Sequence, residues 1–142
     1  MLQGSERQRV VLTAAMSNTR PNMIEDKERI SEMPLVIIES PFAGDIETNI
    51  KFARACMRDA LLNGEAPFAS HLLYTQDGIL DDKIFGERSL GIEAGLTWGK
   101  RANKTVVYTN LGITKGMEKG IQRAKDEGRA VEFRELKNWS AS

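Results

Sequence analysis

Hydrophobic and polar positions alternate in blocks from Pro34 onward, and the blocks predict strands and helices in turn. Leu35 to Glu39 is a short run of mostly β-branched residues, continuously apolar as a buried parallel strand is. Asp45 then stands at an N-cap position, and Asn63-Gly64 supplies a helix stop. Between them, apolar residues recur at helical spacing: Ile46, Ile50, Ala53, Met57 and Leu61.

The same alternation continues toward the C-terminus. Ala66 to Ser70 is predicted as a second short strand, and Asp81 or Asp82 can cap a helix that runs to about Arg101. That helix has a broad apolar face: Ile84, Phe85, Leu90, Ile92, Ala94, Leu96 and Trp98. The remaining predicted elements are a strand, a helix ended by Gly128 and a strand with alternating sides: Lys104 to Thr109, Lys115 to Glu127 and Ala130 to Leu136.

Strands that alternate with helices at this spacing imply parallel pairing with right-handed crossovers. We therefore predict an α/β fold for residues 34–142: a three-layer sandwich around a mainly parallel sheet of four to five strands, Rossmann-like or flavodoxin-like. Residues 1–33 are mostly polar. We expect them to form an appended N-terminal arm that is flexible or docked on a neighbouring subunit, with Arg9 to Thr13 as a candidate edge strand.

Composition narrows the classes of partner. The 142 residues include 20 basic and 20 acidic side chains, so the formal net charge is zero. Proteins that bind nucleic acids or anionic membranes usually carry an excess of basic residues, so we expect neither partner. No apolar run approaches the ~18 residues of a membrane span. The single cysteine, Cys56, excludes an intrachain disulfide and favours a reduced, cytoplasmic setting. With only one histidine besides, the chain has too few ligands for a structural zinc site, while magnesium bound by carboxylates stays open. We assign no metal and no cofactor.

Candidate chemistry gathers at two glycine-containing turns. Glu39 to Gly44 (ESPFAG) follows the first strand, and Asn110 to Gly120 (NLGITKGMEKG) follows the third. A turn of this kind at the start of a helix offers free backbone N–H groups and the positive end of the helix dipole, which favours anions. Because ligands of such sheets bind beyond the carboxyl ends of the strands, we expect both turns to border one crevice.

The order of the motifs along the chain resembles that of a known group of proteins. The order SPFAG, long helix, PFASHLLYT, DD, ER, GIEAG, W and VVYTNLGITKGM resembles small bacterial and phage proteins that look like the nucleoside 2-deoxyribosyltransferase superfamily. The resemblance covers about Pro34 to Leu136. It implies a small Rossmann-like sheet, cleavage or exchange of the N-glycosidic bond of a small nucleotide, and a homo-oligomer whose subunits complete one another's sites.

The resemblance also implies roles for single residues. Thr114-Lys115-Gly116 corresponds to the Ser/Thr-x-Gly turn that holds a 5′-phosphate in the superfamily's nucleotide hydrolases. The superfamily's nucleophilic glutamate lies four residues after the turn glycine, where this chain has Gly120. Glu118 lies two residues earlier and therefore about 200° around the helix from that direction. This branch of the superfamily is thus expected to lack the usual nucleophile.

The candidate ligand contacts come from the two turns and two helices: Ser40, Pro41, Phe42, Gly44, Asn49, Arg88, Thr114, Lys115, Gly116 and Met117. Phe42 can stack on a base because it lies in a loop, and Arg88 can bind a phosphate bidentately. The alternative interpretation is an ordinary capped turn with solvated charges. For Trp98 and Tyr108, the simplest expectation is a place in the core.

Three residues are candidates for catalysis: His71, Glu93 and Glu118. His71 can act as an acid toward a leaving base because its ordinary pKa lies near neutrality, although a structural hydrogen-bonded histidine is equally expected. Glu93 or Glu118 would supply the carboxylate that stabilises an oxocarbenium-like state, as in glycoside hydrolysis. The sequence thus predicts an N-glycosidase acting on a nucleoside monophosphate or a related nucleotide, with a catalytically silent nucleotide binder as the alternative.

Overall fold

The computed structural model describes residues 2, 3, 7, 8 and 32–141, and it divides into two units, Met1–Met33 and Pro34–Ser142. In the first unit, β1 (Leu2–Gln3) pairs antiparallel with β2 (Arg7–Gln8). The candidate edge strand at Arg9 to Thr13 lies outside the described residues.

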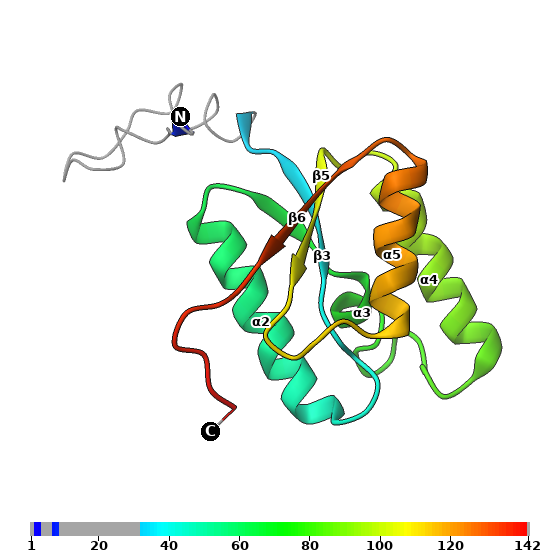
Figure 1. The fold of residues 1–142 in the computed structure, drawn as a ribbon. Coiled ribbons are helices and arrows are strands. Elements are labelled where there is room, and N and C mark those ends of the chain that lie inside the picture. The colour runs from blue at the N-terminus through cyan, green and yellow to red at the C-terminus, as the bar shows by residue number, and fades with distance from the viewer. Residues whose placement is uncertain (1, 4–6, 9–31, 142) are drawn as a thin grey trace. The chain divides into compact units, whose positions relative to one another are not determined.

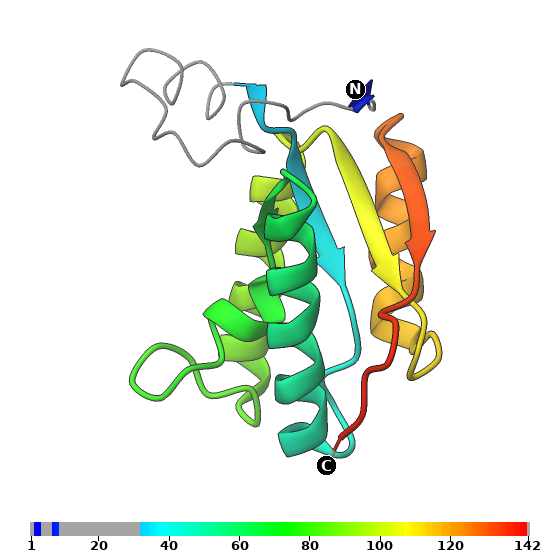
Figure 2. The ribbon, with the colours of Figure 1, turned by 90° about the vertical axis from the view of Figure 1, so that its left-hand side faces the viewer.

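The second unit is built on a four-stranded parallel sheet with the strand order β4-β3-β5-β6. Its strands are β3 (Leu35–Glu39), β4 (Ala66–Phe68), β5 (Lys104–Tyr108) and β6 (Ala130–Arg134). The cyan, yellow and orange arrows of β3, β5 and β6 point the same way in Figure 2.

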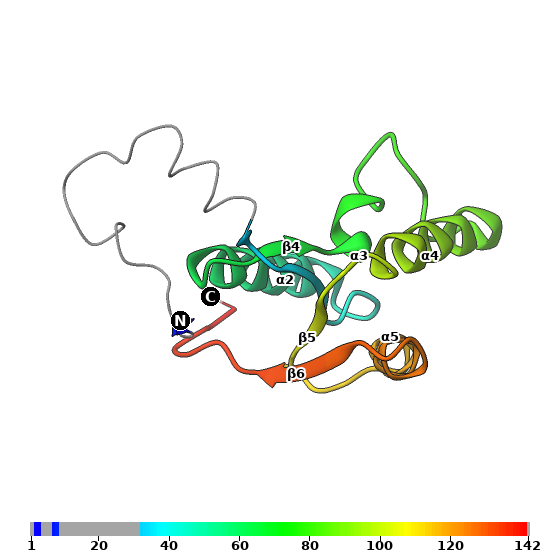
Figure 3. The same cartoon turned by 90° about the horizontal axis from the view of Figure 1, so that it is seen from above.

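Helices cover the sheet on both sides. α2 (Ile46–Leu62) lies on one side, and α4 (Phe85–Gly99) and α5 (Lys115–Asp126) lie on the other (Figures 1 and 3). α3 (Ser70–Leu73) is a single turn after β4. This confirms the predicted α/β fold with a parallel sheet. Within the described part of the chain, none of the helices combines the length and apolarity that crossing a bilayer requires.

The core forms two clusters, one on each side of the sheet. Under α2, the strands contribute Val36, Ile38, Val106 and Tyr108, and the helix contributes Phe52, Cys56 and Ala60. Under α5, Val107 packs with Met117 and Ile121, and Val131 closes the cluster. Tyr108 is fully buried, which confirms its predicted place in the core.

The inward face of α2 differs from the predicted one. Asp45 caps the helix as expected, since its carboxylate accepts the backbone N–H of Thr48. However, the buried residues are Asn49, Phe52, Ala53, Cys56 and Ala60, whereas Ile46 and Leu61 are exposed. The helix is rotated because Asn49 turns inward to bind the preceding loop.

The largest difference from the sequence-based prediction concerns the buried face of α4. Its predicted apolar face is largely exposed, with Phe85 at 84% and Trp98 at 57%, so the core assignment of Trp98 is wrong. The helix instead turns a glycine stripe inward: a Cβ on Gly95 would lie 2.6 Å from the Ser70 side chain, and one on Gly91 would lie 3.2 Å from Leu80. Close approach of the backbone therefore outweighs burial of the larger side chains here.

Three predicted boundaries also shift. α4 begins at Phe85 without a side-chain cap, and Asp81 instead accepts the N–H of Lys83 while its own N–H donates to Glu87. β4 ends at Phe68, so Ser70 starts a helical turn rather than ending a strand. β6 ends at Arg134, two residues before the predicted end.

Candidate functional site

The carboxyl ends of β3 and β5 form the edge where the candidate residues gather. These two strands are neighbours, and Glu39 pairs in register with Val107. The chain leaves β3 through α2 on one side of the sheet and leaves β5 through α5 on the other (Figures 1 and 3). This is the switch point in strand order at which parallel α/β sheets bind ligands. Both glycine-containing turns follow these two strands, as predicted.

The first turn is held by Asn49. Its side-chain amide donates to the carbonyl oxygens of Phe42 and Ala43 at 2.9 and 3.0 Å. Ser40 and Pro41 are buried behind the loop, and Gly44 has a φ of +102°, which a glycine adopts without the strain that a side chain would bring. The predicted contact residue Asn49 thus shapes the loop, while Phe42 is half-buried within it.

Ser40 and His71 were predicted separately, and the structure brings them together. Ser40 Oγ lies 2.7 Å from His71 Nε2, although the two residues are 31 positions apart. Burial disfavours the imidazolium and lowers the pKa of His71 to about 4, so the ring is neutral at pH 7. His71 reaches this position from α3, not from the end of a strand. The pair can orient a ligand by hydrogen bonds at the carboxyl edge.

The second turn begins α5. Thr114 is the N-cap, and its Oγ1 accepts the N–H of Met117 at 3.2 Å. Met117 is buried under the helix, which places it in the core behind the turn. Lys115 and Gly116 are exposed, and the first N–H groups of a helix lack partners inside it. The arrangement can receive an anion at the start of α5.

The charged candidates lie on helix surfaces. Arg88 and Glu93 are exposed on α4, and Glu118 is exposed on α5. Arg88 approaches the carboxylate of Asp82 at 4.0 Å. Among the described residues, none of these three side chains forms a hydrogen bond or an ion pair with the two turns.

Sequence reasoning missed Glu39, the last residue of β3. Its side chain is partly buried, and desolvation raises its pKa to about 8, although the guanidinium of Arg129 acts in the opposite direction. Its Oε2 occupies the place where a Cβ on Gly120 would stand, and Oε1 lies 2.9 Å from that place. An acidic residue at the end of an apolar strand was the signal that could have found it.

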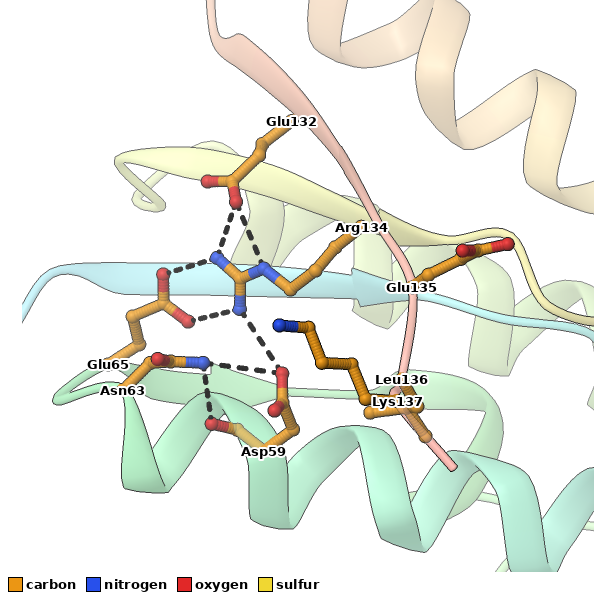
Figure 4. A pocket seen from close by; sticks show the side chains of 8 residues that line it. All are labelled: Asp59, Asn63, Glu65, Glu132, Arg134, Glu135, Leu136 and Lys137. Atoms are coloured by element: carbon orange, nitrogen blue, oxygen red, sulfur yellow. Dashed lines mark hydrogen bonds and ion pairs between the residues drawn. The ribbon is translucent and has the colours of Figure 1, made fainter. Parts of the chain in front are cut away.

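A second group of charged residues was not predicted and lies on the α2 side of the sheet. It comprises the Arg134 cluster, defined as Asp59, Glu65, Lys104, Tyr108, Glu132 and Arg134. Arg134 donates to both oxygens of Glu65 at 2.9 Å, and Lys104 Nζ lies 2.9 Å from Glu65 and 2.7 Å from Glu132. Figure 4 shows the guanidinium surrounded by carboxylates.

The Arg134 cluster borders a cavity of about 550 Å³ that is also lined by Asn63, Glu135, Leu136 and Lys137. Its central charges are already paired with one another across α2, β5, β6 and the segment before β4. Within the described residues, no three His, Cys, Asp or Glu side chains are arranged to hold a metal ion.

Comparison with known proteins adds two findings. Residues 34–134 match the model of a domain of unknown function, DUF7768. Among solved structures, the chain is similar to a 2-deoxyribosyltransferase from Bacillus psychrosaccharolyticus, with 17% sequence identity, 75% of each chain covered and a TM-score of 0.52. At this identity the likeness shows the fold, which agrees with the fold expected from the sequence motifs. The comparison with curated proteins gave no match.

Proposed function

The chain belongs to the DUF7768 family, and we propose that it handles a small nucleotide, most specifically as an N-glycosidase of a nucleoside monophosphate or a related compound. One observation carries the proposal: in a fold like that of a 2-deoxyribosyltransferase, the two glycine-containing turns follow neighbouring strands at the switch point. The family description itself assigns no activity.

The second turn is the proposed phosphate site. The first N–H groups of α5, the Thr114 hydroxyl and the Lys115 ammonium would hold the phosphate, since a helix N-terminus favours anions and lysine adds a point charge. Gly116 keeps the backbone open to the ligand, and Met117 supports the turn from the core. Arg88 is proposed as a further phosphate contact.

The first turn is the proposed site for the nucleoside. Phe42 is the proposed stacking partner of the base, and the Ser40–His71 pair is proposed to bond to the sugar or to the departing base. Pro41, Gly44 and Asn49 would keep the loop in shape, which the two bonds from Asn49 to the loop carbonyls support. Cleavage would proceed through an oxocarbenium-like state beside a carboxylate, for which Glu93 and Glu118 were the sequence-based candidates.

A panel of nucleosides and nucleotides tests the function. We expect free base, detected by chromatography, to accumulate in proportion to protein, and the melting temperature to rise with the preferred nucleotide. Thr114→Ala should weaken both responses, whereas Thr114→Ser, which keeps the hydroxyl and the cap, should retain them. If no nucleotide releases base or raises the melting temperature, the proposal is wrong.

A catalytically silent nucleotide binder is the second candidate. The observation that favours it is Gly120, because the position expected for the nucleophile carries no side chain. Under this alternative, the panel would give a rise in melting temperature without any release of base.

We also propose that the protein is a cytoplasmic homo-oligomer. The number of large exposed apolar side chains on α4, namely Phe85, Leu90, Ile92 and Trp98, supports association. Light scattering on the wild type and on Leu90→Glu would test this, with a lower mass expected for the variant. A wild type that is monomeric at micromolar concentration would contradict it.

A further inference from the structure

We propose that Glu39 is the catalytic acid of this site: it gives its proton to the departing base and then takes a proton from the attacking water. The inference rests on the proposed N-glycosidase function and names a residue for it that lies on neither α4 nor the exposed face of α5.

The position of Glu39 is the first support. It ends β3 at the switch point, and the next residue, Ser40, is bonded to His71. Its carboxyl group lies against Gly120 of α5, the helix whose first turn is the proposed phosphate site. Gly120 follows Thr114 by six residues, or about 9 Å along the helix axis. The acid, the Ser40–His71 pair and the anion turn therefore all come from elements that meet at the carboxyl ends of β3 and β5, with the acid about 9 Å along α5 from the anion turn.

The second support is the environment of Glu39, which is only partly exposed. Among the described residues, no hydrogen bond or ion pair reaches its carboxyl group. The charged group that acts on it is Arg129, whose guanidinium is already bonded to Thr105, Glu127 and the carbonyl of Gly99. Around it, α5 presents Gly120 and β5 presents Val107, and in the described part of the chain no second carboxylate contributes to its raised pKa. Buried carboxyl groups are rarely left alone, and such exceptions concentrate at functional sites.

The third support is the fit between Glu39 and Gly120. A side chain at position 120 would occupy the place that the Glu39 carboxyl group fills, so the two positions are complementary. Gly120 lies between Met117 and Ala124 on the face of α5 that packs on the sheet. A glycine there gives the carboxyl group of β3 its room beside the helix.

The resulting chemistry balances with water as the only co-reactant. The C1′–N bond breaks, its electron pair goes to the base nitrogen, and that nitrogen receives the Glu39 proton. The sugar is left as an oxocarbenium-like cation beside the new carboxylate. A water oxygen then bonds to C1′, and its proton passes to Glu39, which is restored. A carboxyl group with a pKa of about 8 holds its proton at pH 7 and is suited to this first step.

Three proteins measured side by side test the inference: the wild type, Glu39→Gln and the matched control Glu47→Gln, which alters an exposed acid on α2. Glu39→Gln keeps the shape of the side chain but has no acidic proton. We expect its base release to fall by about 10²–10⁴-fold. Its nucleotide-induced rise in melting temperature should remain, and Glu47→Gln should match the wild type in both measurements.

A pH profile of the wild type needs no variant and provides a second readout. Base release should be constant below pH 8 and fall about tenfold per pH unit above it, as Glu39 loses its proton. Glu39→Gln activity that equals wild-type activity, or a profile without the alkaline fall, would overturn the role of Glu39 while leaving the N-glycosidase standing. A wild type that releases no base would overturn both.

Discussion

Two glutamates on opposite sides of the sheet, Glu65 buried and Glu39 partly buried, have opposite environments. Glu65, 5% exposed, receives two N–H groups of Arg134 and lies 2.9 Å from Lys104 Nζ. Glu39, on the α5 side, receives no such bond among the described residues, and its pKa rises to about 8. The first residue is bonded to cations, whereas the second lies against Gly120 and feels only the more distant charge of Arg129.

The difference in bonding suggests that Glu65 has a structural role and Glu39 a chemical one. A buried carboxylate with full partners has its charge compensated where it lies, and removing one partner leaves that charge unpaired. A buried carboxyl group without partners keeps its proton and can release it to a ligand. The Arg134 cluster joins α2, β5, β6 and the segment before β4, whereas Glu39 ends β3 at the switch point with its carboxyl group against Gly120 of α5.

Removing Arg134 should have the largest effect on the free energy of unfolding. Arg134→Met leaves Glu65, Glu132 and Asp59 with too few cations, and we expect a loss of about 3–5 kcal/mol. Urea unfolding followed by circular dichroism measures it. Arg134→Lys keeps the charge but not the paired N–H bonds to Glu65, so its free energy of unfolding should lie between those of the wild type and Arg134→Met. A loss below 1 kcal/mol for Arg134→Met would show that the cluster is not a structural centre.

Replacing Glu39 by glutamine should raise the free energy of unfolding rather than lower it. Its raised pKa means that the folded protein holds the proton while the unfolded chain, with a pKa near 4.5, releases it. The stability that this proton confers is complete below pH 4.5 and is lost as pH rises to about 8. Glu39→Gln should therefore match the wild type at pH 4 and exceed it by roughly 2–4 kcal/mol at pH 8. Urea unfolding of both proteins at pH 4 and pH 8 measures this difference. Equal stability of the two proteins at pH 8 would contradict the raised pKa.

Filling the space at Gly120 should cost somewhat less. Gly120→Ala places a methyl group on the Glu39 carboxyl group, and we expect a loss of about 1–3 kcal/mol. In Glu39→Ala the space is open, so Gly120→Ala should cost little there. The double-mutant cycle measures this coupling. Additive losses would mean that the two residues do not compete for one place.

Much of the sheet could be predicted from the sequence because its strands are continuous apolar runs. β3 and β5 were correctly predicted to within one residue, and Asp45, Asn63 and Gly128 identified the helix ends. α4 could not be oriented, because its apolar residues are spread around the helix and three glycines, at 91, 95 and 99, decide which side approaches the rest of the protein. Periodicity does not encode such close approach.

The candidate site was predictable only where a motif followed a strand. The two turns were found in this way, but the 2.7 Å contact between Ser40 and His71 depends on the pairing of β3 with β4 and on the short α3. Glu39 was missed because an acid at a strand end usually points to solvent. Only the packing of α5 on β3 shows that Gly120 leaves it partly buried.

The smallest expected effect belongs to an exposed ion pair, and it completes the comparison of buried and exposed charges. Arg123 and Glu127 lie 3.5 Å apart at positions i and i+4 near the end of α5, with Arg123 40% exposed. Water screens such a pair, so Arg123→Ala should change the free energy of unfolding by less than about 0.5 kcal/mol. Glu127 keeps its bond to Arg129 in this variant. Urea unfolding at low and high salt measures the difference. A loss comparable to that of Arg134→Met would mean that charge alone, rather than burial, determines what these ion pairs contribute.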